Sequence, residues 1–323
     1  MTVNVVDFGA TPDGSADSTQ AFHDAIAATF VPQAKFGPQQ TAGDVFVPPG
    51  AYKVGSINAT DLQGLRLRCI PGTVGLYADQ QSTPMPVLDL AGSSNCEVEG
   101  LILAGQQYLN AAAPAVMPTC GFLIADTAPG GRSTKNTIRK CGTVGWFLHA
   151  AMLLRGATDH LITDTALQSQ NPLTHALYAG AVNPWNTPSH QPLAPQWTKQ
   201  PCGNLTFLHA ELHAVFSQPS KTHTTRFWDC DAIRFVGGLS DNTGGPAPDD
   251  GPGHVIINGE VYGLVYQGLQ FYSEGGAAAK CIIDNQGVLV RPSLRVCNVT
   301  RHNATVGPVI VGNAPVNPIL ETY

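Results

Sequence analysis

Short apolar runs, broken by polar and turn-forming residues, follow one another along most of the chain. Near the N-terminus Val45 and Val47 alternate with other residues, Pro48-Pro49-Gly50 makes a turn, and Tyr52 and Val54 resume the alternation. A period of two is typical of a strand with one buried side. The pattern therefore predicts two short strands joined by a tight turn.

A similar segment recurs later in the chain. It has two or three mostly apolar residues, a polar residue at its fifth place and a second short run, and copies start at residues 95, 136, 160, 225, 254 and 280. Another strand-like run starts at Asn204. The intervals fit a unit of about 20 to 30 residues with loop insertions, which we expect near residues 105–120 and 183–202. Together with the scarcity of long helical patterns, this favours a solenoid of short strands.

One amphipathic segment near the N-terminus breaks the strand pattern. Phe22, Ile26 and Phe30 recur every four residues, which predicts a short helix with Asp17 as its cap and Gln20 as the capping-box partner. Stacked strands rise about 4.8 Å per rung and leave an apolar first rung. We expect the helix to cover that rung, with its three large apolar residues facing the core.

Composition supports a large, turn-rich domain and excludes several partners. The chain has 323 residues, 43% of them hydrophobic and only 12% charged, with 34 glycines and 25 prolines. The net charge is −6 and no cluster of Lys and Arg is present, so no nucleic-acid partner is expected. No run approaches the roughly 18 apolar residues of a membrane span, so no membrane insertion is expected.

The first ten residues, MTVNVVDFGA, lack the basic and apolar regions of a secretory signal. This favours assembly in a cytoplasm, unless a signal has been removed.

The N-terminal motif resembles a known superfamily. The stretch DFGATPDGSADSTQAFHDAI from Asp7, followed by VFVPPGAYKV from Val45, is similar to the start of pectate-lyase-like right-handed β-helix proteins, especially those of bacteriophage tailspikes. The resemblance implies an all-β, single-stranded right-handed parallel β-helix with three sheets and an N-terminal capping helix. For phage members it also implies a homotrimer that contacts or cuts surface polysaccharide.

The expected organisation is one continuous domain. Residues 1–54 form the start with the capping helix, residues 55–300 the rungs, and residues 301–323 a final cap or a trimer contact.

Comparison with pectate lyases and polygalacturonases identifies candidates but no complete site. Lyases of this superfamily use calcium-binding carboxylates and a catalytic arginine on neighbouring rungs. The sequence offers Arg226, Arg234 and Arg291, although solvated surface arginines are the simpler interpretation. The polygalacturonase elements have partial counterparts between Asn242 and His254. They lie within less than one rung and cannot stack on separate rungs, so this stretch is better interpreted as a turn-rich loop.

Carboxylates at the fifth place of the recurring segment suggest a tailspike-type hydrolase site. Two carboxyl groups about 5 Å apart, or about 6.5 to 9.5 Å apart, are needed for glycoside hydrolysis, and stacked rungs can supply such distances. If the segments are in register, Asp229 and Asp284 flank Asn258 in one column. The candidate catalytic residues are Asp229, Asp231, Glu260 and Asp284. The favoured alternative is that Asp and Asn at these places, including Asp164, stabilise turns through their backbone hydrogen bonds.

Tryptophans provide candidate glycan-binding residues. Trp185 and Trp197 lie in the Pro-rich stretch NPWNTPSHQPLAPQW, which reads as a loop outside the rungs. They could stack on sugar rings or attach the loop to the solenoid or to a neighbouring subunit. Trp228 lies beside Asp229 in a strand-like run, and Trp146 is expected in the core.

The cysteines and histidines show no metal-binding spacing, and we expect no cofactor. The eight cysteines are separated by intervals near one or two repeat lengths. This predicts small buried side chains, with disulfides between stacked repeats as the alternative in an oxidising setting. His209 and His213 would lie about 13 Å apart along a strand, too far to share an ion.

These observations lead to one functional hypothesis with two alternatives. The first is a trimeric phage virion spike that contacts host surface glycan, with or without hydrolysing it, alongside other virion proteins. The second is a structural decoration protein of the phage head, neck or tail. The third is a bacterial pectin-type lyase or polygalacturonase.

Overall fold

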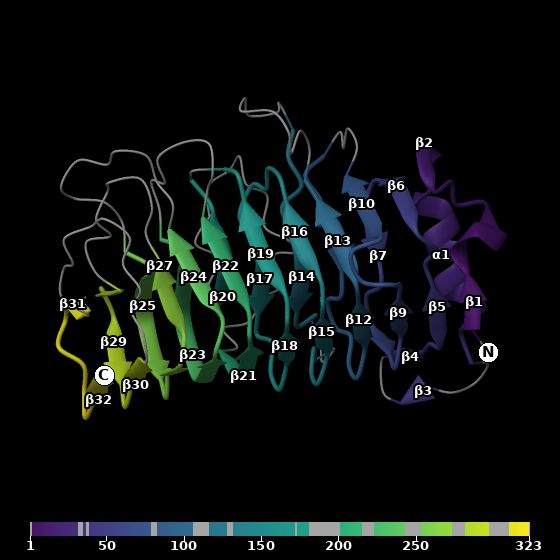
Figure 1. The fold of residues 1–323 in the computed structure, drawn as a ribbon. Coiled ribbons are helices and arrows are strands. Elements are labelled where there is room, and N and C mark those ends of the chain that lie inside the picture. Colours follow the sequence, from purple (N-terminus) through teal and green to yellow (C-terminus); the bar gives the residue numbers. More distant parts are fainter. Residues whose placement is uncertain are drawn as a thin grey trace.

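The computed structural model describes residues 2–31, 35–36, 39–78, 83–105, 116–127, 132–171, 173–180, 201–214, 223–242, 253–272, 282–296 and 310–322. Within these ranges the chain is a right-handed parallel β-helix, as the sequence predicted (Figure 1). The one antiparallel strand pair in the described residues joins β3 (Lys35–Phe36) to β4 (Gln39–Thr41), which in turn pairs with β8 (Leu62–Gln63). None of the described helices is long and apolar enough to cross a membrane.

Three faces, each made of in-register parallel strands, enclose the core. Face 1 consists of β7 (Ile57–Asn58), β11 (Leu88–Asp89), β14 (Cys120–Ala125), β17 (Ala150–Arg155), β20 (His175–Gly180), the first parts of β23 (Thr225–Val236) and β25 (Val255–Tyr262), β28 (Ile283–Asn285) and β31 (Ile310–Gly312). Face 2 consists of β1 (Thr2–Asn4), β5 (Asp44–Phe46), β9 (Arg66–Arg68), β12 (Glu97–Glu99), β15 (Thr137–Arg139), β18 (Leu161–Thr163), β21 (Cys202–Leu208), the second part of β23, β26 (Val265–Gln267), β30 (Ser293–Val296) and β32 (Ile319–Thr322).

Face 3 is the separate sheet of β2 (Asp13–Asp17), β6 (Gly50–Val54), β10 (Val74–Ala78), β13 (Leu101–Ala104), β16 (Gly142–Val144), β19 (Ala166–Ser169), β22 (Glu211–Ala214), β24 (Leu239–Asn242) and β27 (Gln270–Tyr272). The chain runs from face 3 to face 1, then to face 2 and back. β29 (Val288–Val290) pairs with the end of β25, at the corner between faces 1 and 2.

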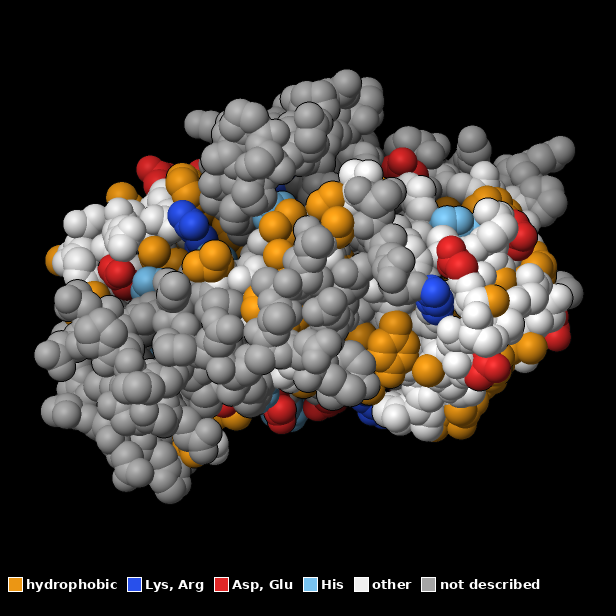
Figure 2. All heavy atoms as spheres, turned by 90° about the horizontal axis from the view of Figure 1, so that it is seen from above, with side chains coloured by type: hydrophobic (Ala, Val, Ile, Leu, Met, Phe, Trp, Pro, Cys, Tyr) orange, Lys and Arg blue, Asp and Glu red, His pale blue; other side chains and the backbone are white. Residues whose placement is uncertain are grey.

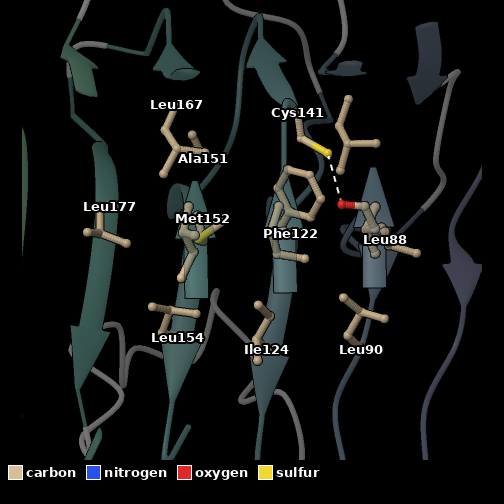
Figure 3. Close-up of a cluster of buried hydrophobic side chains, with 14 of the residues drawn as sticks. Leu88, Leu90, Phe122, Ile124, Cys141, Ala151, Met152, Leu154, Leu167 and Leu177 are labelled. Carbon is tan, nitrogen blue, oxygen red and sulfur yellow. Dashed lines mark hydrogen bonds between the residues drawn. The ribbon is translucent and has the colours of Figure 1, made fainter. Parts of the chain in front are cut away.

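Inward side chains stack in columns, one from each rung. On face 1 the column includes Leu88, Phe122, Met152 and Leu177, all fully buried (Figure 3). On face 2 the rings of Phe207 and Phe235 stack with centroids 4.5 Å apart, and Tyr266 lies 5.0 Å further along. Stacked rings of this kind add to the stabilisation from buried apolar area.

The predicted helix is α1 (Thr19–Ala28), which lies at the N-terminal end of the solenoid after the 3₁₀ turn η1 (Val5–Phe8) (Figure 1). Phe22 and Ile26 are buried, as predicted, and the Phe22 ring packs edge-on against Tyr52 at 5.6 Å. Phe30 is 38% exposed. The helix ends at Ala28, so Phe30 does not continue the apolar side of the helix toward the core.

The predicted capping box is absent. Ser18 occupies the cap position without a side-chain bond to the helix, and Asp17 instead accepts a hydrogen bond from the amide of Thr19 at 2.9 Å. Gln20 donates forward to Asp24 at 2.8 Å.

The corners are formed by residues with left-handed backbone conformation. One column at the corner between faces 1 and 2 has φ from 50° to 76° at Gly64, Asn95, Lys135, Asp159, Asn204, Ala232, Gly263, Arg291 and Asn317. Only Gly, and next Asn and Asp, adopt this conformation easily. Within the column, the Asn204 side chain donates to Asp159 Oδ1 at 2.6 Å.

All six described cysteines are buried free thiols: Cys69, Cys96, Cys120, Cys141, Cys202 and Cys230. This confirms, for these six, the interpretation as small buried side chains. Cys281 and Cys297 lie outside the described residues.

Candidate functional site

The outer side of face 1 is buried over its middle strands. Leu123, Leu153 and Tyr178 are in register on β14, β17 and β20 and point away from the interior, because side chains alternate along a strand. Their exposed fractions are 1%, 2% and 0%. Together with Ala91, Cys120, Ala125 and Ala150 they form an apolar cluster separate from the solenoid core.

Figure 2 views the edge at which the face 3 strands end. On this side apolar side chains lie among scattered charged ones, with no large patch of a single sign in the described part.

The outer side chains of face 1 become polar on the following strands. We call these residues the polar strip: Tyr178, His223, Arg226, Trp228, Asn258, Asp284 and Gln286.

Arg226 is the centre of the polar strip. Its Nε–H donates to Asn258 Oδ1 at 3.0 Å, and its guanidinium carbon lies 5.0 Å from the centre of the Trp228 ring. Within the described residues its two terminal nitrogens have no hydrogen-bond acceptor and no carboxylate within ion-pair distance. The guanidinium is thus held through its Nε–H and against the Trp228 ring. Its two terminal nitrogens, which form a fork of N–H donors, have no acceptor among the described residues.

The strip continues as a chain of polar contacts. The Asn258 amide donates to Gln286 Oε1 at 3.5 Å, and the Gln286 amide donates to Asp284 Oδ2 at 3.0 Å. His223 Nε2 lies 3.6 Å from the same Asp284 oxygen. His175 Nδ1 donates to the backbone carbonyl of His223 at 2.7 Å. Side chains from four successive strands therefore hold one another in fixed positions.

Burial controls protonation in this region. It lowers the pKa of His223 to about 4, although Asp284 opposes this, and it lowers the pKa of His175 to about 3. Burial also lowers the pKa of Arg226, while it raises that of the Tyr178 hydroxyl. At neutral pH the strip therefore holds a neutral imidazole at His223, an un-ionised tyrosine and a charged guanidinium.

The predicted column of carboxylates is wrong. Asn258 is in register with Trp228, whereas Asp284 is in register with Ile256 and, through it, with Arg226. The pattern misled because the assumed starts 225, 254 and 280 are not in register: Thr225 pairs with Val255, which pairs with Ile283, so the fifth places of these segments do not coincide.

The other three predicted catalytic carboxylates lie past the strip, at the corner that follows face 1. Asp229 has φ of 53° and accepts the Glu260 amide at 2.8 Å, the geometry of the turn interpretation. Glu260 accepts the Tyr262 hydroxyl at 3.1 Å, and Asp231, in register with Tyr262, is exposed. Asp164 also has a left-handed conformation, at the corner between faces 2 and 3.

Of the predicted glycan-binding residues, Trp228 lies in the strip, whereas Trp185 and Trp197 lie outside the described residues. Trp146 is buried, as expected. Among the lyase candidates, Arg234 and Arg291 are exposed and only Arg226 joins the strip.

The stretch compared with polygalacturonases can be placed only at its ends. His254 is buried inside the solenoid and bonds Ser240 at 3.1 Å, so it does not reach an outer site. Residues 243–252 lie outside the described ranges.

Sequence reasoning missed three residues of the strip, Tyr178, His223 and Gln286. Each belongs to the strip only through the register of neighbouring rungs, and irregular loop lengths conceal that register. The usable signal in the sequence was the pair Arg226 and Trp228, which are two residues apart on one strand and therefore lie on the same side of it.

A second polar cluster lies on face 3. His213 Nδ1 is 3.4 Å from Asp241 Oδ2, and His213 Nε2 is 3.4 Å from Glu211 Oε2. Asp241 is 5% exposed, and its other oxygen has no partner among the described residues. Burial alone would lower the pKa of His213, but the hydrogen bonds and charges of Asp241 and then Glu211 outweigh it and raise this pKa.

The polar strip combines a guanidinium, an indole ring, two amides and one carboxylate. A retaining or inverting pair needs two carboxyl groups within about 10 Å, and Asp284 is the only carboxylate of the strip in the described residues. Those residues also contain no group of three or more His, Cys, Asp or Glu placed to hold a metal ion.

Comparisons with known proteins support the fold. The family model for rhamnogalacturonase A/epimerase, pectate lyase-like, matches residues 2–64, which confirms the resemblance to the pectate-lyase-like superfamily. No curated protein matches the sequence.

Among solved structures, a surface adhesin of Streptococcus pneumoniae, PfbA, is similar over 98% of this chain and 76% of its own, with 14% identity and a TM-score of 0.61. The A-module of the Azotobacter vinelandii mannuronan C-5 epimerase AlgE4 is similar over 99% and 98% of the two chains, with 14% identity and a TM-score of 0.48. The tailspike gp49 of Acinetobacter baumannii bacteriophage Fri1, a capsular polysaccharide depolymerase, is similar over 99% of this chain and 63% of its own, with 9% identity and a TM-score of 0.48. At these identities the likeness concerns the fold.

Proposed function

We propose that this chain, a parallel β-helix of the pectate-lyase-like superfamily, binds a carboxylate-bearing surface polysaccharide along the polar strip. The observation that carries the proposal is Arg226, held by Asn258 and Trp228 with its terminal nitrogens unoccupied. A guanidinium fork matches the two oxygens of a carboxylate. An adjacent indole provides a flat apolar surface for a sugar ring.

The strip also has the arrangement that a polymer requires. Asn258, Gln286 and Asp284 provide amide and carboxylate groups for sugar hydroxyls, and they lie on successive rungs spaced about 4.8 Å apart. An extended chain lying across the rungs would meet Trp228 and Arg226 first and the amide groups next. Because the contacts within the strip already fix these side chains, little conformational freedom is lost on binding.

The biological setting that we propose is a spike of a phage particle that contacts host surface polysaccharide. The N-terminal motif, similar to that of tailspikes, supports this setting. The homotrimer that the resemblance to phage members implies remains a prediction.

The proposal is tested by binding measurements with defined polymers. Polygalacturonate, which carries a carboxylate on each sugar, should bind, and neutral dextran should not. Trp228→Ala should weaken polygalacturonate binding at least tenfold. Tyr262→Ala removes an exposed aromatic side chain at the end of β25, outside the strip, and should leave this binding unchanged. Equal binding of both polymers, or no effect of Trp228→Ala, would contradict the proposal. Attachment to purified phage particles without any polysaccharide binding would instead favour a decoration protein.

A further inference from the structure

Two buried cysteines face each other at the end of the polar strip. Cys202 begins β21, Cys230 lies in β23 two residues after Trp228, and the two are register partners on adjacent parallel strands. They are 0% and 1% exposed. Neighbouring strands lie about 4.8 Å apart, and disulfides form between Cα atoms about 4.4 to 6.8 Å apart.

The two thiols already interact. The side chains of Cys202 and Cys230 are hydrogen-bonded to each other, and the Cys230 thiol also donates to the carbonyl of Ala179 at 3.2 Å. Burial opposes ionisation of Cys202, but the bond from Cys230 and nearby backbone amides outweigh it and lower the pKa of Cys202. Burial raises the pKa of Cys230. Cys202 is therefore the thiol that ionises first.

No two of the other four described cysteines are register partners on adjacent strands. Cys69 and Cys141 follow β9 and β15, which are separated by β12. Cys96 lies between Leu65 and Asn136 in the neighbouring rungs. Cys120 is in register with Ala150. The 202–230 pair is thus a specific feature of the rungs that carry Arg226 and Trp228.

We propose that Cys202 and Cys230 form a disulfide when the chain folds in the presence of a low-molecular-weight disulfide such as oxidised glutathione. The Cys202 thiolate attacks one sulfur of the reagent, which releases one glutathione thiolate and leaves a mixed disulfide. The Cys230 thiol then loses its proton and attacks the Cys202 sulfur, which releases the second glutathione. The two cysteines lose two electrons and two protons, and the reagent gains them as two thiols.

The bond would fasten β21 to β23 directly beyond the polar strip. It closes a loop of 28 residues and restricts the unfolded chain. Oxidising conditions exist outside the cytoplasm, including at virion surfaces. The proposal does not depend on polysaccharide binding.

Peptide mapping tests the pairing directly. Trypsin cleaves after Lys199, Lys221, Arg226 and Arg234, so the two cysteines fall on separate peptides, 200–221 and 227–234. The purified chain is refolded with oxidised glutathione, its remaining thiols are alkylated, and it is digested without reductant. We expect the two peptides to be joined, and the joined species to disappear on reduction. Two separate alkylated peptides, or a bond between other cysteines, would overturn the proposal.

Thermal unfolding tests whether the disulfide stabilises the fold. The oxidised chain should melt about 5 °C higher than the reduced chain. Cys202→Ala and Cys230→Ala should each abolish the difference in melting temperature between the oxidised and the reduced chain. The control, Cys96→Ala, removes a buried thiol outside the pair and should retain both this difference and the joined peptides. An oxidised chain that contains the bond but melts no higher than the reduced chain would show that the disulfide does not stabilise the fold.

Discussion

On face 2, near the capped end, charges of opposite sign alternate from rung to rung, whereas the Arg226 guanidinium of the polar strip on face 1 has no anion within ion-pair distance among the described residues. The face 2 ladder contains Asp44 on β5, Arg66 and Arg68 on β9, Glu97 and Glu99 on β12, and Arg139 on β15. Arg68 lies 2.8 Å from Asp44, and Arg139 lies 2.5 Å from Glu97 and 2.9 Å from Glu99.

The difference separates a structural use of charge from a functional one. In the ladder every cation has an anion on the adjacent rung, so the register itself neutralises the charges. In the polar strip Arg226 bonds a neutral amide and packs on a ring, although burial of an uncompensated charge is costly. The fold can place charges in matched columns and does not do so here, which supports the proposal that Arg226 serves a ligand.

The largest expected effect is the loss of folding stability in acid, to which the buried histidine of the polar strip contributes. Burial lowers the pKa of His223 and His160 to about 4, and of His175 and His254 to about 3. Below about pH 6.5 the unfolded chain binds protons at these histidines and the folded chain does not. Stability is therefore lost as the pH falls from about 6.5 toward 4, by about 2 kcal/mol per histidine at pH 5.

The test is the change in melting temperature between pH 7 and pH 5. His223→Gln should reduce this change, because one of the groups that binds protons only on unfolding is removed. His209→Asn, at an exposed turn, should leave it as in the parent chain. An identical pH dependence in all three proteins would show that His223 is not buried as a neutral group.

Arg226→Gln should weaken polygalacturonate binding about 30-fold, since a hydrogen bond to a charged group contributes about 2 kcal/mol. The amide keeps much of the packing against Trp228 and loses the fork. Arg234→Gln makes the same replacement at an exposed position of the same strand and should bind normally. Equal affinities of the two variants would mean that the unoccupied fork has no role, and the strip would then resemble the ladder.

Arg139→Glu should destabilise the ladder by about 1 to 2 kcal/mol, because it places a third carboxylate beside Glu97 and Glu99. Arg139→Gln should cost less, since it removes the attraction without adding repulsion. Both are measured as shifts in melting temperature, and 1 M salt should reduce the difference between them. A difference unaffected by salt would indicate that packing of the side chain, and not charge, holds these rungs together.

The architecture was readable from the sequence because its signals are local. Phe22 and Ile26 mark a helix by their own spacing, and Val45 to Val54 mark paired strands around one turn. Each depends on a few neighbouring residues and on no count of residues between rungs. The extension of the stripe to Phe30 failed because the pattern does not show where a helix ends.

The site was only partly predictable because it depends on register across long loops. Asp284 and Trp228 were identified, but Asp284 was assigned to a column that the structure does not form. A shift of the assumed start by one residue turns every side chain to the other side of the strand. The left-handed corner residues, such as Asn95, Asp159 and Asn204, would have given the register, yet Lys135 and Ala232 occupy the same column and conceal it.

The smallest expected effect concerns His213, where the sign is opposite to that for His223. Asp241 and Glu211 raise the pKa of His213, so its stabilising contribution is fully present below about pH 6.5 and is lost as the pH rises through the folded-state pKa. The contribution should be below about 1 kcal/mol, because Glu211 is largely exposed. His213→Gln should therefore lower the melting temperature slightly at pH 6 and not at pH 9, and Glu211→Gln should produce a weaker form of the same change. A variant that lost as much stability at pH 9 as at pH 6 would show that His213 acts through packing, and the matched charges of face 2 would then have no counterpart on face 3.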